Sequence, residues 1–104
     1  MSRNPLLKGL KPTHPGEVLR EDVLPALGRS KTEIADLLGV SRPTLYDVLN
    51  EKRPITPNLA LRIGKLVGGG PEIWLTMQQA YDLAAAEVEL ANDLAAIPTL
   101  HNAA

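Results

Sequence analysis

The side chains of this chain that are best suited to chemistry are basic and polar, and they lie in the segment 31–53. Arg42 could donate two hydrogen bonds to the O6 and N7 acceptors of a guanine, or it could neutralise a phosphate. Thr44 could contact a thymine methyl group or a phosphate, and Asp47 could accept a hydrogen bond from cytosine or remain solvated. These residue types indicate recognition of a nucleic acid.

Groups that could catalyse a reaction or hold a metal are scarce in the sequence. It has no Cys and two His, and His14 and His101 lie far apart along the chain. His14 and Glu17 have a spacing that two metal ligands could use, but this pair supplies half a site, and a role at a helix start is the stronger interpretation. The glycines at 68–70 are not followed by the Lys-Ser/Thr of a phosphate-binding loop. We expect no enzyme, no metal and no cofactor.

Charge is distributed unevenly, although the formal net charge is only −1. Residues 28–66 include seven basic and four acidic residues, whereas from residue 67 onward there are five acidic residues and no Lys or Arg. The first segment suits a phosphate backbone and the second does not. We expect a basic face for DNA and an acidic end for a second partner, although small domains also carry such asymmetry by chance.

Length and composition predict a single domain. The chain has 104 residues, of which 44% are hydrophobic, and this is enough for one ordinary core. Apolar stretches are interrupted well before the roughly 18 residues of a membrane span, and residues 1–11 lack the apolar core of a secretory signal. Together with the absence of Cys, this predicts a cytoplasmic protein that is not bound to a membrane.

Helical spacing dominates the chain, and hairpin dipeptides and alternating strand patterns are absent. The first helix is expected from about His14 to residue 27, with an end or a bend at Pro25. Ser30 with Glu33 predicts a capped second helix, and Ser41 a capped third helix that runs to about residue 50. A fourth helix is expected at 57–67 and a long fifth one from 71 up to residue 97. The predicted fold is an all-α, five-helix bundle with a long C-terminal helix.

The segment 31–50, KTEIADLLGVSRPTLYDVLN, has the spacing of two helices packed around a tight turn. Ala35 allows the helices to approach closely, and Gly39 tolerates the positive φ that the turn requires. The five positions that must face the shared core are all apolar: Ile34, Leu38, Val40, Leu45 and Val48. A helical hairpin with a purely structural role is the alternative, but it does not require the whole set in register.

This segment resembles the helix-turn-helix of phage repressors and of related bacterial regulators. Four further pieces resemble the HigA family of antitoxins in their order and spacing: HPGEVL at 14–19, NEKRPITP at 50–57, LALRI at 59–63 and PEIWLTMQQAYDL at 71–83. The chain departs from the family pattern in the glycines at 68–70 and in Lys31, where Gln is common. Neither departure affects the expected fold.

The resemblance implies the antitoxin of a type II toxin-antitoxin module. Such a protein is a dimeric, sequence-specific DNA-binding autorepressor that also neutralises a RelE-like (HigB-type) toxin, which cleaves messenger RNA. The alternative is a stand-alone helix-turn-helix regulator without a toxin partner. The chain is expected to divide into a flexible N-terminal arm at 1–13, a DNA-binding domain with its dimerisation helix at 14–86, and an acidic helical extension and tail at 87–104.

In a helix-turn-helix, the second helix enters the major groove. The base-reading residues are expected near its N-terminus: Arg42, Pro43, Thr44 and Asp47. Pro43 can add only shape and apolar contact. Phosphate contacts are expected from the flanking residues: Lys31, Tyr46, Asn50, Lys52 and Arg53. For Asn50, a role as helix C-cap is an equal alternative, and Arg53 could instead help to hold the loop 50–56 that joins two helices.

One such unit binds weakly, so we expect a homodimer on double-stranded operator DNA with an inverted repeat, its two reading helices about 34 Å apart. Dimerisation is expected through an apolar stripe on the last helix: Trp74, Met77, Tyr81 and Ala84. The stripe could instead pack on its own domain, and we expect Trp74 to anchor the helix while later residues meet the partner.

The toxin contact remains open between two regions. RelE-like toxins are expected to be basic, which favours the acidic side of this chain, including Asp22 and the last helix. The N-terminal segment 1–12 is the alternative, although its Arg3, Lys8 and Lys11 suit an acidic surface better.

Overall fold

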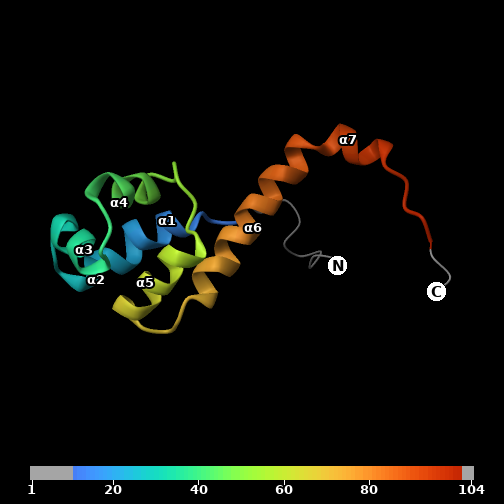
Figure 1. Ribbon diagram of the computed structural model, residues 1–104. Helices are drawn as coiled ribbons and strands as arrows, with labels where there is room; N and C mark the ends of the chain where they lie inside the picture. The colour runs from blue at the N-terminus through green and yellow to red at the C-terminus, as the bar shows by residue number, and fades with distance from the viewer. Residues whose placement is uncertain (1–10, 102–104) are drawn as a thin grey trace.

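The computed structural model describes residues 11–101, and every regular element in that range is helical (Figure 1). The elements are α1 (Pro15–Val18), the π-helical turn η2 (Leu19–Val23), α2 (Leu24–Leu27), α3 (Lys31–Leu38), α4 (Arg42–Leu49), α5 (Pro57–Val67), α6 (Glu72–Glu89) and α7 (Ala91–Ala96). The predicted all-α class is confirmed. The five expected helices are present, but the first and the last are subdivided.

The first helix does not end at Pro25 but continues past it, with a π-helical turn directly before the proline. The Leu24 N–H donates to the Leu19 carbonyl oxygen, five residues back, which closes the π turn. Pro25 follows in the first turn of α2. Since proline has no N–H with which to continue the α-helical ladder, the π turn directly before it absorbs the missing bond.

Local caps fix the turn between α3 and α4. The Ser30 hydroxyl accepts from the Glu33 N–H at 3.1 Å, and the Ser41 hydroxyl accepts from the Thr44 N–H at 3.2 Å. Gly39, at φ 73°, ends α3 in the left-handed conformation that glycine adopts without steric cost. These three predictions from the sequence are confirmed.

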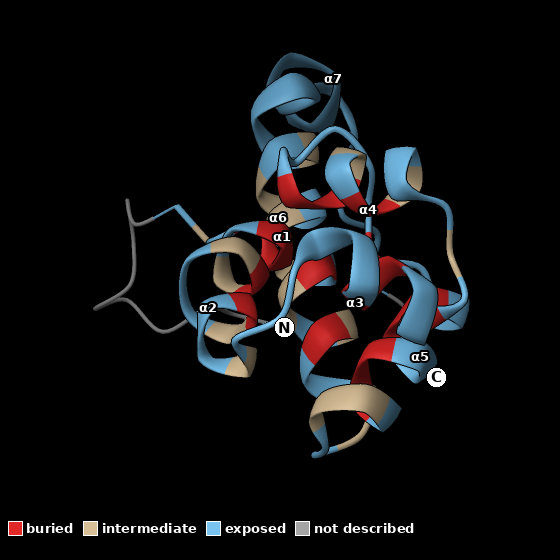
Figure 2. Cartoon of the chain, turned by 90° about the vertical axis from the view of Figure 1, so that its left-hand side faces the viewer, coloured by how far each residue is buried: buried red, intermediate tan, exposed pale blue. Residues whose placement is uncertain are grey.

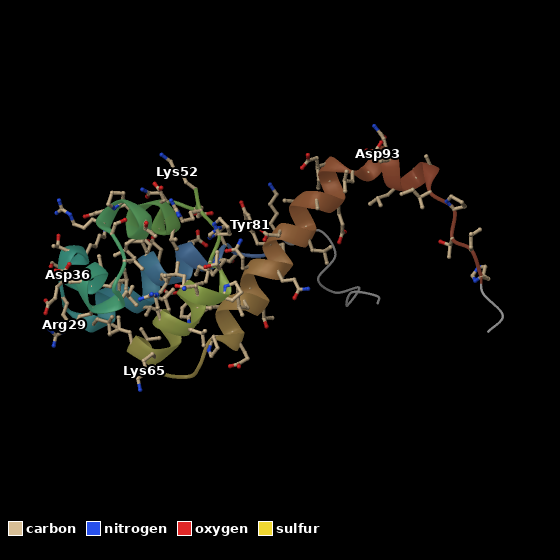
Figure 3. All side chains as sticks on the ribbon, viewed as in Figure 1. Arg29, Asp36, Lys52, Lys65, Tyr81 and Asp93 are labelled. Carbon is tan, nitrogen blue, oxygen red and sulfur yellow. The ribbon has the colours of Figure 1, made fainter. Side chains whose placement is uncertain are left out.

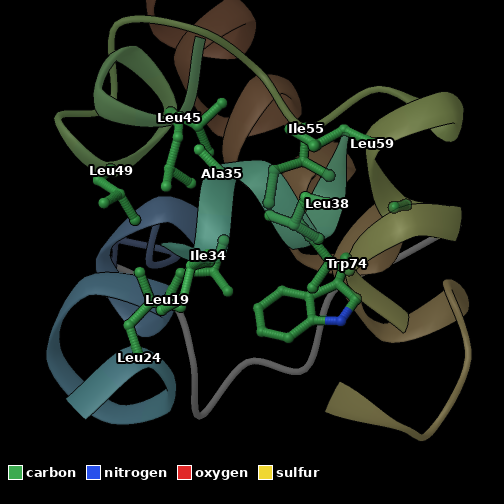
Figure 4. Close-up of a cluster of buried hydrophobic side chains, with 13 residues drawn as sticks. Leu19, Leu24, Ile34, Ala35, Leu38, Leu45, Leu49, Ile55, Leu59 and Trp74 are labelled. Atoms are coloured by element: carbon green, nitrogen blue, oxygen red, sulfur yellow. The ribbon is translucent and has the colours of Figure 1, made fainter. Parts of the chain in front are cut away.

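The core lies where α1 to α5 meet, and the start of α6 closes it (Figure 4). Of the five positions expected to face it, four are buried, and Val40 packs against them partly buried. Trp74 is 4% exposed and joins α6 to this core. Leu66 and Val67, at the end of α5, lie at its edge and are partly buried.

The second half of α6 and all of α7 extend away from the domain (Figure 1), and α7 is exposed along its length (Figure 2). The expected single helix is interrupted at Leu90, and α7 ends at Ala96, two residues before Pro98. Residues 1–10 of the expected N-terminal arm, with Arg3 and Lys8, and residues 102–104 of the expected tail lie outside the described residues. Between residues 11 and 101, no helix is long and apolar enough to cross a membrane.

Candidate nucleic-acid interface

The two sides of α4 differ in polarity. Leu45 and Val48 are buried on one side, whereas Arg42, Pro43 and Tyr46 are exposed. Thr44 and Asp47 are half-buried at the margin. The four predicted base-reading residues therefore all keep some access to solvent on the helix that follows the turn.

Arg42 is held between the two helices of the helix-turn-helix. It is the first residue of α4, and its guanidinium donates to the Thr32 hydroxyl of α3 at 3.2 Å. The Thr44 hydroxyl accepts from the Ser41 hydroxyl at 2.8 Å, within the cap. Both side chains are thus partly ordered before any DNA is bound.

The predicted phosphate-contacting residues are brought together with α4 by two pair contacts. The Lys31 ammonium lies 5.5 Å from the centre of the Tyr46 ring. The Arg53 guanidinium lies 3.8 Å from the Asp47 carboxylate. Since both side chains of this ion pair remain open to solvent, the pair contributes little to stability, and a phosphate can replace the carboxylate at small cost.

The remaining two predicted phosphate residues follow α4 directly. Asn50 is the C-cap of α4, and its backbone N–H donates to the Tyr46 carbonyl at 2.9 Å. The Lys52 N–H donates to the Asp47 carbonyl at 2.8 Å, and its side chain points away from the domain (Figure 3). Asn50 thus occupies the C-cap position, and its side chain is exposed.

Two arginines that the sequence analysis did not single out hold the helix-turn-helix in place. Arg20 donates to the Leu49 carbonyl at the end of α4 at 2.6 Å and lies 3.5 Å from the Glu51 carboxylate. Arg62 donates to the Leu38 carbonyl at the end of α3 at 2.9 Å. A cation at a helix C-terminus satisfies carbonyls that lack helical partners. These arginines therefore orient α3 and α4.

His14 has the helix-start role that the sequence predicted. It is 3% exposed, its Nδ1 accepts from the Gly16 N–H at 2.9 Å, and its ring meets the edge of Tyr81 at 4.8 Å. Burial lowers the pKa of His14, and the nearby Glu51 and Asp82 carboxylates partly oppose this shift. Among residues 11–101 there is no cluster of three potential metal ligands.

The stripe expected to form the dimer contact faces its own domain. Trp74 is buried, Met77 packs against the core partly buried, and Tyr81 packs against His14. Trp74 is thus the anchor that the sequence predicted, but its burial leaves it almost no surface for a partner. Of the four residues of the stripe, only the half-buried Ala84 lies where α6 starts to project from the domain.

Exposed apolar side chains lie on other positions of α6 and after it. Leu83 is 51% exposed and Val88 80% exposed, and four more follow: Leu90, Leu94, Ile97 and Leu100. A groove of about 530 Å³ runs beside Leu83, lined also by Ile55, Leu75 and Ala86 and by the polar Gln79 and Asp82.

Known proteins share this architecture. The family model described as helix-turn-helix matches residues 19–74. Virulence-associated protein I of Dichelobacter nodosus is 45% identical over 74 residues, which cover 71% of this chain and 68% of that protein. The solved structure of antitoxin GraA is 35% identical, with a TM-score of 0.82. The match covers 88% of this chain and 100% of the GraA chain. A structure described as Pseudomonas aeruginosa antitoxin HigA with the higBA promoter is 33% identical, with a TM-score of 0.81 and the same coverage.

The chain belongs to the HigA family of helix-turn-helix proteins. This family consists of DNA-binding regulators and antitoxins and not of enzymes. The matched region spans η2 to the first turn of α6, so it contains α4, both orienting arginines and the core that supports them.

Proposed function

We propose that this chain is the antitoxin of a type II toxin-antitoxin module, a dimeric autorepressor that binds its operator and neutralises a RelE-like (HigB-type) toxin. The observation that carries the proposal is the helix-turn-helix itself, in which α4 presents Arg42 while Arg20 and Arg62 hold the ends of the two helices. The Pseudomonas aeruginosa antitoxin HigA, whose whole length this chain covers, is described with its promoter.

On DNA, α4 would lie in the major groove. Base edges are read by four residues: Arg42, Pro43, Thr44 and Asp47. Phosphates are bound by five residues: Lys31, Tyr46, Asn50, Lys52 and Arg53. When Arg53 binds a phosphate, Asp47 is released from its ion pair and can accept a hydrogen bond from a cytosine amino group.

Two copies are proposed to pair through the apolar residues of the projecting part of α6 and of α7, including Leu83, the half-buried Ala84 and Val88. Within residues 11–101, Leu83 and Val88 are left at least half open to solvent, in contrast to Trp74. Selection from a random pool of DNA duplexes tests this part. An enriched inverted repeat is expected, and enrichment of an unpaired half-site would contradict the dimer.

The toxin is proposed to bind the acidic side of the molecule, where α6 and α7 carry all five acidic residues that follow residue 67 and no basic residue. Co-purification of a tagged toxin candidate with chains lacking residues 1–12 or 87–104 tests this. Loss of the toxin with the first truncation alone would assign the contact to the N-terminal arm. A chain that binds DNA but no product of a neighbouring gene is a stand-alone regulator.

A further inference from the structure

Gln78 is a buried polar residue in the middle of α6, with 5% of its surface exposed. Its Oε1 accepts from the Ile55 N–H at 2.8 Å, and its Nε2 donates to the Asp82 carboxylate at 2.9 Å. Burying an amide costs free energy unless its polar atoms find partners. Here both ends of the amide are used, and one of the partners belongs to a distant part of the chain.

Ile55 lies in the segment that joins α4 to α5, two residues after Arg53 and three after Lys52. Residues 54–56 are not helical, so no helical hydrogen bonds fix the position of this segment relative to α6. The Ile55 side chain is 2% exposed in the core, and its backbone is held by the hydrogen bond to Gln78. Lys52 and Arg53 line the same open pocket, of about 190 Å³, as Gln78, Tyr81 and Asp82 of α6.

We propose that Gln78 is a positioning residue for DNA binding. Through its hydrogen bond to Ile55, it fixes the loop between α4 and α5 against α6, in the position from which Lys52 and Arg53 bind phosphates. The inference rests on the phosphate contacts proposed above for these two residues. Two residues of extended chain span at most about 7 Å, so a shift of the Ile55 backbone after loss of this hydrogen bond also shifts Arg53, whose remaining contact is the solvent-open ion pair with Asp47. The helix that emerges toward a partner thus also sets the geometry of the DNA-binding loop.

The test uses the full chain and a mixed-sequence DNA duplex, because phosphate contacts need no operator. Gln78→Leu is expected to weaken binding about threefold to tenfold and to reduce the slope of log K against log salt by about 0.9 for each phosphate that is no longer bound. Amide exchange at Ile55 should accelerate while exchange in α3 and α4 stays unchanged. The matched control is Gln79→Leu, because Gln79 is the exposed neighbour on the same helix.

A second pair of variants separates this role from folding. Gln78→Glu places two carboxylates side by side, at residues 78 and 82, and is expected to weaken DNA binding. Adding Asp82→Asn restores the net charge and lets the new amide donate to the new carboxylate, so the double variant is expected to regain the wild-type affinity and salt slope. This comparison decides the matter if Gln78→Leu does not fold.

The outcomes distinguish this inference from the proposed function. If Ile55 exchanges faster in Gln78→Leu while DNA affinity and salt slope stay at the wild-type values, Gln78 is structural only and the inference is overturned. The same holds if the double variant with Asp82→Asn binds DNA as weakly as Gln78→Glu alone although circular dichroism shows both to be folded like the wild type. A wild-type chain that binds no duplex would instead overturn the proposed function itself.

Discussion

Arg42 starts α4 and is already tied to α3 through Thr32, so its guanidinium loses little freedom when it binds a base. We predict that Arg42→Ala lowers operator affinity by about 1–3 kcal/mol and relaxes the preference at one base pair. Binding to a panel of single-base operator variants measures this. Arg42→Lys is the matched variant, since a lysine keeps the charge but cannot donate in the planar, bidentate manner. If Arg42→Lys binds the whole panel like the wild type, Arg42 contacts a phosphate.

Lys52 points away from the domain (Figure 3) and makes no side-chain contact that would occupy its ammonium group among the described residues. Lys52→Ala is predicted to weaken binding evenly on all sequences and to reduce the salt slope by about one. Titration of a duplex at several salt concentrations measures the slope. Lys65→Ala, on the last turn of α5, is the control and should leave the slope unchanged.

His14 makes the stability of the fold depend on pH. Because burial lowers the pKa of His14 below its ordinary value of 6.5, the unfolded chain takes up this proton first as the pH falls. The stability that neutral His14 contributes is therefore complete above pH 6.5 and is lost as the pH falls from 6.5 through the lower, folded-state pKa. Urea unfolding at about pH 7.5 and about pH 5.5, on either side of the ordinary pKa, measures the difference.

His14→Asn is predicted to flatten that difference, because Asn also caps helices but does not titrate. His101→Asn, at an exposed position, should preserve it. An equal pH dependence in wild type and His14→Asn would assign the effect to other groups.

At the scale of elements, the contact between α5 and the start of α6 depends on Gly64. A Cβ at this position would lie 2.4 Å from the Gly70 carbonyl carbon. In an isolated helix, alanine would stabilise this position by about 1 kcal/mol, but here the steric clash dominates. We predict that Gly64→Ala destabilises the fold by about 1–3 kcal/mol, as measured by urea unfolding. A stabilised variant would show that the backbone of Gly70 moves aside freely.

The parts of this fold that sequence patterns predict are those whose signals are local. A capping serine and its N–H partner lie three residues apart, and Gly39 needs only its own φ. The arginine contacts of the site could not be predicted in this way, because Arg20 and its carbonyl partner are 29 residues apart. Tyr81 shows the same limit: its helical spacing predicted an apolar face, but only the position of His14 shows that this face turns inward.

At the scale of the whole molecule, the domain leaves its apolar surface uncovered on α6 and after it. We predict that Val88→Glu abolishes the proposed dimer, because Val88 is 80% exposed on the projecting part of α6 and a charge in a paired apolar surface is costly. Sedimentation at micromolar concentration measures the mass, and circular dichroism checks that the helices remain.

Leu61→Glu is the control, since Leu61 is 61% exposed but lies on α5, away from the proposed pairing surface. A dimer that survives Val88→Glu and dissociates with Leu61→Glu would move the pairing surface to α5.

The length of α6 determines the distance between the DNA-binding domain and the proposed pairing residues. The helix has 18 residues and is thus about 27 Å long, with the DNA-binding domain fastened at one end by Trp74 and the proposed pairing residues at the other. Each residue inserted between them would lengthen the arm by about 1.5 Å and rotate the far end by about 100°. In the proposed dimer, the length of α6 would set both the spacing and the helical phase of the two operator half-sites, and operators of related proteins should then differ in spacer where this helix differs in length.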